Sequence, residues 1–276
     1  MRIRFTKMHG LGNDFVVIDA ISQNPNLTAN VVQRISDRRF GVGCDQLLVV
    51  EHPTQPDVDF RYRIFNADGS EVENCGNGAR CFAKFVRDRR LTGKSRIVVE
   101  TNAGIMTLVV QKDGLVSVDM GAPQMAPAQI PLAIDQQAPR YQLQALDQTV
   151  EFGSVSVGNP HAVLLVDDVT SAPVAQLGPA IEAHPLFPNK VNVGFMQVVA
   201  NNEIHLRVFE RGVGETQACG TGACAAAVVG QTQGLLGEDV LVHLPGGDLN
   251  LHWGGGEQSI IMTGPAATVF HGQIKL

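Results

Sequence analysis

Several features that define common protein classes are missing from this sequence. Charged residues make up 17% and aromatic residues 5% of its 276 positions, and the net charge is −6. The acidic surplus argues against nucleic acid or an anionic membrane surface as a partner. No apolar run approaches the roughly 18 residues of a membrane-spanning helix, and the first residues lack the apolar core of a secretion signal. We therefore expect a globular cytoplasmic protein.

Metal and cofactor motifs are missing as well. The five cysteines are odd in number and never spaced Cys-x-x-Cys, so we expect reduced thiols and no zinc site. Two glycine strings, Gly10-Leu11-Gly12 and Gly212-Val213-Gly214, stop short of Gly-x-Gly-x-x-Gly because Phe15 and Gln217 occupy the third glycine position. With no motif for a dinucleotide or for pyridoxal phosphate, we expect no cofactor.

One short string occurs twice. Cys75-Gly76-Asn77-Gly78-Ala79 returns as Cys219-Gly220-Thr221-Gly222-Ala223, at an offset of 144 residues. At that offset, residues 63–79 and 207–223 share seven identities over 17 positions. Each half therefore presents one cysteine on a glycine-rich turn that leads into an apolar segment. Two such turns facing each other would place a thiol on either side of whatever lies between them. That geometry is needed to remove a proton from one face of a carbon and to return one to the other.

Weaker matches extend this repeat, and the composition predicts a β-rich fold. Gly12-Asn13 corresponds to Gly158-Asn159, and Gly43-x-x-Gln46 to Gly194-x-x-Gln197. Short β-branched runs and 29 glycines indicate many strands. Helices are predicted in two pairs, at 29–39, 79–89, 174–183 and 223–235. We interpret the chain as two β-rich halves related by a pseudo-twofold axis.

The two helices that follow the repeated cysteines differ in polarity. Residues 223–229 are apolar all round, so we expect this helix to be buried along its whole circumference. The helix at 79–89 carries Arg80, Lys84 and Arg87, and we expect it to be partly exposed. A buried Ala-rich helix wrapped by strands fits a barrel around a central helix better than a parallel βαβ array.

A cysteine at a helix N-terminus is a candidate acid or base. A free thiol titrates near ~8.5, and the exposed amides and dipole of a helix N-terminus lower that value. Cys75 and Cys219 are both predicted at such positions, with glycines that allow close approach of a ligand to the backbone. Cys44, Cys81 and Cys224 are interpreted as ordinary buried thiols.

Other polar residues recur beside apolar strands. Asparagine is common in turns, so any one of these residues alone carries little information. Glu210-Arg211 ends an apolar strand and could bind a zwitterion, and His161 could tune the pKa of a thiol, although a lone histidine is more often a core residue. The recurring amides are Asn13, Gln46, Asn66, Asn159 and Asn192.

Longer strings resemble those of the diaminopimelate epimerase family. The similarity covers essentially the whole chain. It implies a cofactor-independent, homodimeric isomerase that interconverts the LL and meso forms of 2,6-diaminopimelate, in lysine and peptidoglycan precursor biosynthesis. The similar strings are 7–15 (KMHGLGNDF), 63–71 (RIFNADGSE), 75–80 (CGNGAR), 158–161 (GNPH), 208–212 (VFERG) and 215–223 (ETQACGTGA).

The resemblance also implies a fold and residue roles. The family has two similar domains, each a β-barrel-like sheet around a central helix, with the ligand in the cleft between them. We expect domains at 1–119 with the C-terminal strand 265–276, and at 120–264. Cys75 and Cys219 are the implied catalytic residues, and His161 and Glu210 the thiol-tuning ones. The implied substrate contacts are Asn13, Gln46, Asn66, Gly76, Asn77, Asn159, Asn192, Glu210, Arg211, Gly220 and Thr221.

Two other functions remain open. A proline or hydroxyproline racemase of the same fold would also use two cysteines, but it would not need Arg211 and the asparagines for a second amino acid head group. A thiol redox protein predicts one reactive cysteine with a resolving partner. Duplicated cysteine loops fit that class poorly, and a peroxide consumption assay discriminates it.

Overall fold

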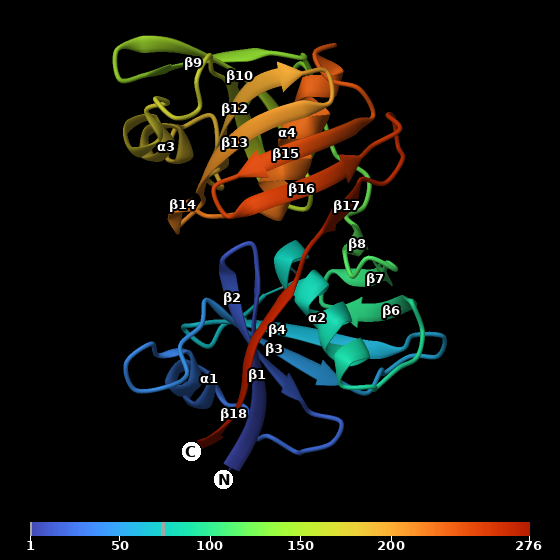
Figure 1. Ribbon diagram of the computed structural model, residues 1–276. Coiled ribbons are helices and arrows are strands. Elements are labelled where there is room, and N and C mark those ends of the chain that lie inside the picture. The colour runs from blue at the N-terminus through green and yellow to red at the C-terminus, as the bar shows by residue number, and fades with distance from the viewer. Residues whose placement is uncertain (1, 73–74) are drawn as a thin grey trace. The chain divides into compact units, whose positions relative to one another are not determined.

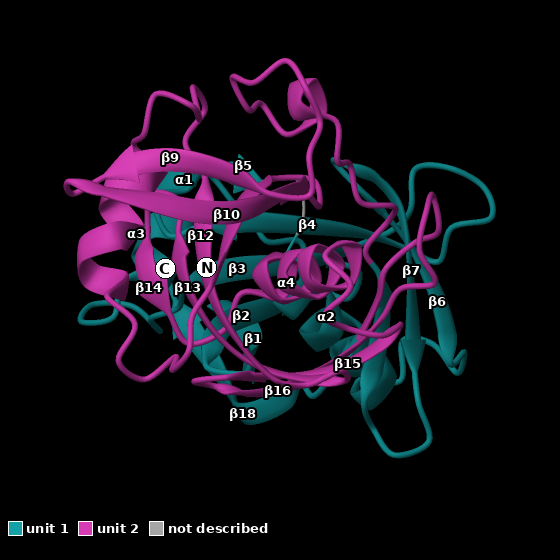
Figure 2. Ribbon diagram, turned by 90° about the horizontal axis from the view of Figure 1, so that it is seen from above, with its two compact units in different colours: residues 1–119, 263–276 teal, residues 120–262 magenta. Residues whose placement is uncertain are grey.

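The computed structural model describes residues 2–72 and 75–276. The chain divides into two compact units, residues 1–119 with 263–276 (unit 1) and residues 120–262 (unit 2), each with strands and helices of an α+β fold (Figure 2). No helix in these described ranges is both long and apolar enough to cross a membrane.

Unit 1 has two helices, α1 (Ala29–Ser36) and α2 (Gly76–Asp88), and a curved sheet (Figure 1). The last strand of the chain returns to this unit and pairs antiparallel with the first. The strands are β1 (Arg2–Gly10), β2 (Asn13–Asp19), β3 (Gln46–Glu51), β4 (Phe60–Asn66), β5 (Glu71–Val72), β6 (Arg96–Thr101), β7 (Gly104–Val110), β8 (Val116–Asp119) and β18 (Ala267–Lys275).

Unit 2 has α3 (Val174–Glu182) and α4 (Gly220–Thr232), together with a short 3-10 helix, η1 (Pro127–Gln129). Strand β17 (Ile261–Gly264) crosses the boundary between the two units. The other strands are β9 (Tyr141–Ala145), β10 (Gln148–Ser156), β11 (Pro160–Leu165), β12 (Asn192–Ala200), β13 (Glu203–Glu210), β14 (Gly214–Thr216), β15 (Asp239–Leu244) and β16 (Gly247–His252).

Both units have the same strand connectivity, so the sequence repeat is a structural repeat. In unit 1, β2 pairs parallel with β3, β3 antiparallel with β4, and β4 parallel with β6. In unit 2, β11 pairs parallel with β12, β12 antiparallel with β13, and β13 parallel with β15. The parallel registers agree closely, since Phe60 pairs with Val99 in one unit and Ile204 with Val242 in the other.

One predicted match between the halves was wrong. Phe15 pairs with Gln46, and His161 pairs with Asn192. Phe15 and His161 each lie two residues after the asparagine of a Gly-Asn turn. Their partners on the neighbouring strand therefore correspond, so the structural counterpart of Gln46 is Asn192 and not Gln197. A shared glycine and glutamine had suggested the other alignment, but pairing with the neighbouring strand fixes the register.

A helix lies at the centre of the curved sheet in each unit. Helix α2 contacts β1, β2, β3, β7 and β8, and α4 contacts β10, β11, β12, β13, β15 and β16. Figure 2 shows the strands of unit 2 arranged around α4. Residues 222–230 of α4 are all buried, as the apolar sequence predicted. Small side chains allow this burial because strands can approach such a helix from every side.

The prediction of a partly exposed α2 holds only for its C-terminal half. Residues 76–83 are all buried, and they include Arg80, whose relative exposure is 0%. Lys84 is partly exposed and forms an ion pair with Asp88 at 3.0 Å, four residues further along the helix. The sequence predicted that Arg80 is exposed, because an arginine is almost never fully buried without polar partners.

Candidate active site

Cys75 is the N-cap residue of α2. Its backbone is extended, with φ −152° and ψ 120°, and its carbonyl accepts the first helical hydrogen bond from the Ala79 amide at 2.8 Å. The same carbonyl accepts a hydrogen bond from the Tyr62 hydroxyl at 3.3 Å. Gly78 leaves room for that hydroxyl, because a Cβ there would lie 2.4 Å from it. The half-buried Cys75 thiol is therefore held on a fixed turn.

The predicted polar side chains of unit 1 form two contacting groups, one of which includes Cys75. The Cys75 Sγ atom lies 3.8 Å from Asn13 Oδ1, which also accepts a hydrogen bond from Asn77 Nδ2 at 3.3 Å. Gln46 donates from Nε2 to Asn66 Oδ1 at 3.0 Å, across the β3–β4 pair. We name Cys75, Asn13, Gln46, Asn66 and Asn77 the Cys75 half-site.

A charged network that the sequence did not indicate lies behind this half-site. Arg38 donates to both carboxylate oxygens of Asp14, at 2.7 and 3.0 Å, and to Asp45 at 2.7 Å, while Lys7 also pairs with Asp14. Asp45 in turn accepts a hydrogen bond from Asn13 Nδ2 at 2.9 Å. Burial alone would raise the pKa of Asp14, but the hydrogen bonds from Arg38 and Lys7 outweigh it and lower that pKa. Asp14 and Asp45 lie next to a predicted site residue, and only that proximity could have signalled them.

Cys219 is the N-cap residue of α4 and is more deeply buried, at 4% exposure. Its carbonyl accepts the first helical hydrogen bond from the Ala223 amide at 3.0 Å, as the Cys75 carbonyl does in unit 1. Its Sγ atom accepts a hydrogen bond from the Gly222 amide at 3.3 Å and lies 3.5 Å from Thr221 Oγ1. The structure thus confirms that both repeated cysteines lie at helix N-termini.

The expected lowering of the thiol pKa is wrong for Cys219. Burial and the negative charge of Glu210 raise its pKa well above the ordinary value, and the hydrogen bonds from Thr221 and Gly222 offset this only in part. The sequence indicates that the thiol lies at a helix N-terminus, but the desolvation of the thiol depends on the folded structure. Burial and the Glu210 charge therefore favour the protonated form of the Cys219 thiol by raising its pKa.

His161 is fully buried on β11, where it pairs with Asn192 of β12. Burial, together with the positive charge of Arg211, lowers its pKa to about 3, so the imidazole is neutral at physiological pH. Nε2 lies 3.0 Å from Asn159 Oδ1, while Nδ1 has no hydrogen-bond partner among the described residues. A neutral His161 contributes hydrogen-bonding capacity to unit 2 and no positive charge that would lower a thiol pKa.

The Asn192 side chain forms hydrogen bonds with two other segments of unit 2. Its Nδ2 atom donates to the Pro160 carbonyl at 3.0 Å, and its Oδ1 atom accepts from the Arg211 amide at 2.9 Å. The exposed Arg211 side chain donates to the Asn189 carbonyl at 3.0 Å, and Thr216 donates to the Glu210 carboxylate. The Cys219 half-site consists of Cys219, Asn159, His161, Asn192, Glu210, Arg211, Gly220 and Thr221.

Two equivalent ion pairs, also missed from the sequence, fasten the hairpins that lead to the cysteines. Arg63 makes a bidentate contact with Glu71 at 2.7 and 2.8 Å, and Arg207 makes one with Glu215 at 2.6 and 3.0 Å. Each pair joins the two strands of a hairpin, β4–β5 or β13–β14. Both arginines and both glutamates were among the seven repeated identities, which was the available signal.

The remaining cysteines are structural. Cys44, Cys81 and Cys224 are at most 2% exposed, as expected, and burial raises the pKa of Cys81 to about 12. All five cysteines lie in the described part of the chain, and no disulfide joins them. No group of three or more His, Cys, Asp or Glu side chains in residues 2–72 and 75–276 is arranged to hold a metal ion.

Comparison with solved structures defines the class of fold. The crystal structure of a hydroxyproline epimerase from Agrobacterium vitis, with bound trans-4-OH-L-proline, superposes with a TM-score of 0.71. Its sequence is 16% identical, and the match covers 99% of this chain and 92% of that chain. The two units, each with a cysteine capping a central helix, therefore have the α+β fold found in that epimerase.

Sequence comparison identifies the family within this class. The family model for diaminopimelate epimerase matches residues 5–126 and 153–269, and the chain belongs to that family. The diaminopimelate epimerase of Teredinibacter turnerae is 62% identical over 276 residues, and that of Thioalkalivibrio sulfidiphilus is 63% identical over 278 residues. Both matches cover the whole of each chain. The proline-type racemase and the thiol redox protein are not favoured by these matches.

Proposed function

We propose that this protein is a diaminopimelate epimerase that interconverts the LL and meso forms of its substrate. One observation carries the proposal: in a member of this family, each unit presents a cysteine as the N-cap of its buried central helix. Two chemically equivalent groups on repeated scaffolds suit a reaction that inverts one carbon, because each face of that carbon then has its own acid–base group.

The proposed chemistry is a proton transfer at each face. The thiolate of one cysteine removes the α-proton, and the thiol of the other donates a proton to the opposite face of the same carbon. After turnover the first cysteine is a thiol and the second a thiolate, so the reverse reaction uses the same pair with exchanged roles. Protons balance, and no oxidant, reductant or cofactor enters the proposal.

The protonation state of Cys219 supports a direction for the resting protein. Its raised pKa favours the thiol, which is the form that donates. Cys219 would thus begin a cycle as the proton donor, with Cys75 as the base. In the opposite direction, bound substrate has to bring Cys219 to the thiolate, and the ammonium group of an amino acid next to Cys219 would favour that charge.

The polar residues of both half-sites are proposed to hold the two amino acid head groups. Arg211 would bind a carboxylate of the substrate, and the carboxylate of Glu210 an ammonium group, since Glu210 already raises the pKa of Cys219 through its charge. The amides at Asn13, Gln46 and Asn66 can both donate and accept, which suits a zwitterion. His161 would tune Cys219 by hydrogen bonding as a neutral ring.

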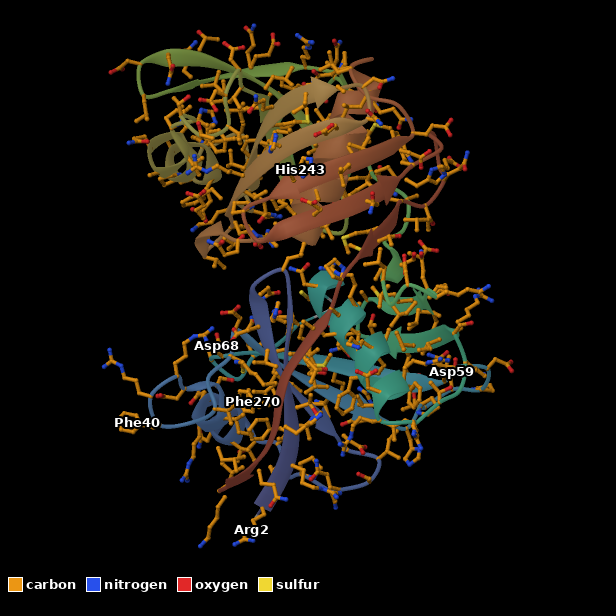
Figure 3. The ribbon with its side chains drawn as sticks, in the orientation of Figure 1. Arg2, Phe40, Asp59, Asp68, His243 and Phe270 are labelled. Atoms are coloured by element: carbon orange, nitrogen blue, oxygen red, sulfur yellow. The ribbon has the colours of Figure 1, made fainter. Side chains whose placement is uncertain are left out.

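We also propose that the enzyme is a cytoplasmic homodimer. Strand β18 carries exposed apolar side chains at Val269 and Phe270, 56% and 46% exposed, and Figure 3 shows Phe270 on the surface of unit 1. Aromatic side chains are enriched in subunit interfaces relative to the rest of a protein surface. Sedimentation equilibrium of the purified protein tests the dimer.

The proposed activity is tested with LL-diaminopimelate. The purified protein is incubated with this substrate in the absence of any added cofactor, and the product is resolved by chiral chromatography. Appearance of the meso form at equilibrium proportions supports the proposal. No meso form, together with turnover of L-proline or hydroxyproline under the same conditions, would transfer the protein to the racemase class.

A further inference from the structure

A buried cation lies next to the Cys75 half-site. Arg80 has 0% exposure and belongs to the first two turns of α2. Both features are unfavourable, because a buried charge loses its hydration and a cation near a helix N-terminus opposes the helix dipole. The position 144 residues later in α4 holds Cys224. The central helix therefore does not need an arginine at this point in order to pack.

The contacts of the Arg80 guanidinium group include three with oxygen atoms of described residues. Its NH2 atom donates to Asn77 Oδ1 at 2.9 Å, and its Nε atom donates to the Pro265 carbonyl at 3.1 Å. A longer contact of 3.5 Å joins NH1 to the Gly76 carbonyl. Gly10 leaves the space, since a Cβ at that residue would lie 3.1 Å from Arg80 NH2. The planar group is thus fixed against the end of β1 and the segment that precedes β18.

Arg80 determines which way the neighbouring amides point. A guanidinium group can only donate, so the oxygen of Asn77 faces Arg80 and its nitrogen faces Asn13 Oδ1, at 3.3 Å. Asn13 then donates from Nδ2 to Asp45 Oδ2 at 2.9 Å, and a carboxylate can only accept. With a donor at one end of this chain and an acceptor at the other, only one orientation of the two amides satisfies these three hydrogen bonds.

The consequence reaches the reactive sulfur. Cys75 Sγ lies 3.8 Å from Asn13 Oδ1, so an oxygen acceptor faces the thiol, and a flipped amide would present a donor instead. In unit 2 the corresponding role falls to a different set, since Cys219 is contacted directly by Thr221 and by the Gly222 amide. The two repeated cysteines therefore differ in the groups that contact their sulfur atoms.

We propose that Arg80 is a positioning residue of the Cys75 half-site, which orients Asn77 and Asn13 so that an amide oxygen faces the Cys75 thiol. This inference rests on the proposed function, in which Cys75 exchanges a proton with the substrate. Arg80 touches no reacting atom in this scheme. It acts through the two amides, and its effect on turnover depends on Asn77.

A double-mutant cycle tests this dependence. Arg80→Lys keeps the charge but loses the planar fork, and it should lower kcat by about 10- to 100-fold, the range for a buried hydrogen-bonding group left unsatisfied. In an Asn77→Ala background, where the relay is already broken, the same change should lower kcat by less than about 3-fold. Arg87→Lys is the matched control on α2, because Arg87 donates to Gly93 O at the far end of the helix, and it should retain wild-type kcat.

The cycle also defines what overturns the inference. Equal losses from Arg80→Lys in both backgrounds, or a kcat no lower than that of Arg87→Lys, would show that Arg80 does not act through Asn77. Should the variants not fold, proton exchange in the wild-type protein decides. The Arg80 Nε proton and the Asn77 amide protons should exchange much more slowly than the Arg87 Nε proton, and equal rates would refute the relay. A wild type inactive on LL-diaminopimelate refutes only the proposed function, since exchange is measured without substrate.

Discussion

The packing of Gly78 against Tyr62 gives a prediction whose size follows from the structure. A methyl group at residue 78 would lie 2.4 Å from the Tyr62 hydroxyl oxygen, 3.3 Å from Leu48 Cδ2 and 3.4 Å from Phe15 Cε1. Tyr62 is 1% exposed and its ring packs on Phe82 with centroids 4.9 Å apart, so the ring cannot move away cheaply. Gly78→Ala must therefore push α2 or break the hydrogen bond from Tyr62 to Cys75.

The expected loss of stability is about 2 kcal/mol. Overpacking of a filled core costs about 1–3 kcal/mol, and the 2.4 Å contact puts this site near the upper end. Alanine recovers about 1 kcal/mol of helix propensity relative to glycine. Because the displaced turn carries Cys75, kcat should fall as well. Urea unfolding followed by circular dichroism measures the first effect, and chiral analysis of the product the second.

A second substitution shows whether the loss of stability comes from the clash with Tyr62 or from any substitution in α2. Tyr62→Phe removes the hydroxyl and, with it, one hydrogen bond worth about 0.5–1.5 kcal/mol. In that background Gly78→Ala should cost less than about 1 kcal/mol, because the closest atom is gone. Gly93→Ala is the control, since nothing lies within 4 Å of a Cβ there. The reasoning is refuted if Gly78→Ala is as stable as Gly93→Ala, or if Tyr62→Phe gives no relief.

Three further predictions address the half-sites. Cys75→Ala and Cys219→Ala should each lower kcat by at least about 10²-fold, with the double variant hardly worse, because the proposed mechanism uses the two thiols as a unit. Because the pKa of His161 is lowered to about 3, the neutral ring contributes fully to the free energy of unfolding above pH 6.5, and this contribution is lost as the pH falls toward about 3. His161→Gln should reduce the change in the free energy of unfolding between these two pH values, as measured by urea titrations. Arg211→Ala should raise KM for diaminopimelate by about 10-fold or more, through loss of a charged contact, and an unchanged KM would remove Arg211 from the substrate site.

Much of the fold could be predicted because one sequence pattern occurs twice in the chain. The Cys-Gly-x-Gly-Ala strings predicted two helix N-termini, and Cys75 and Cys219 are the N-cap residues of α2 and α4. The helix at 223–229 was predicted to be buried all round because its side chains are small and apolar, and it is. Local composition decides such features without reference to the rest of the chain.

What failed depended on contacts between distant residues. Arg80 is buried because Asn77 and the Pro265 carbonyl, 185 positions away, accept its hydrogen bonds. The pKa of Cys219 is raised by desolvation and by Glu210, neither of which a helix position reveals. The same holds for the match between Gln46 and Gln197, which strand register replaced with Asn192. Sequence spacing shows which residues are near along the chain, but burial and charge depend on what the fold brings to them.

The two-thiol mechanism is tested most directly by a first-turnover reaction in deuterium oxide. The accepting thiolate takes the substrate's own proton, while the opposite thiol has already exchanged with solvent. Deuterium should therefore appear at the α-carbon of the product epimer and hardly at all in recovered substrate, in both reaction directions. Substantial unlabelled product in the first turnover would show one base serving both faces, and it would contradict the assignment of Cys75 and Cys219 to opposite faces of the substrate carbon.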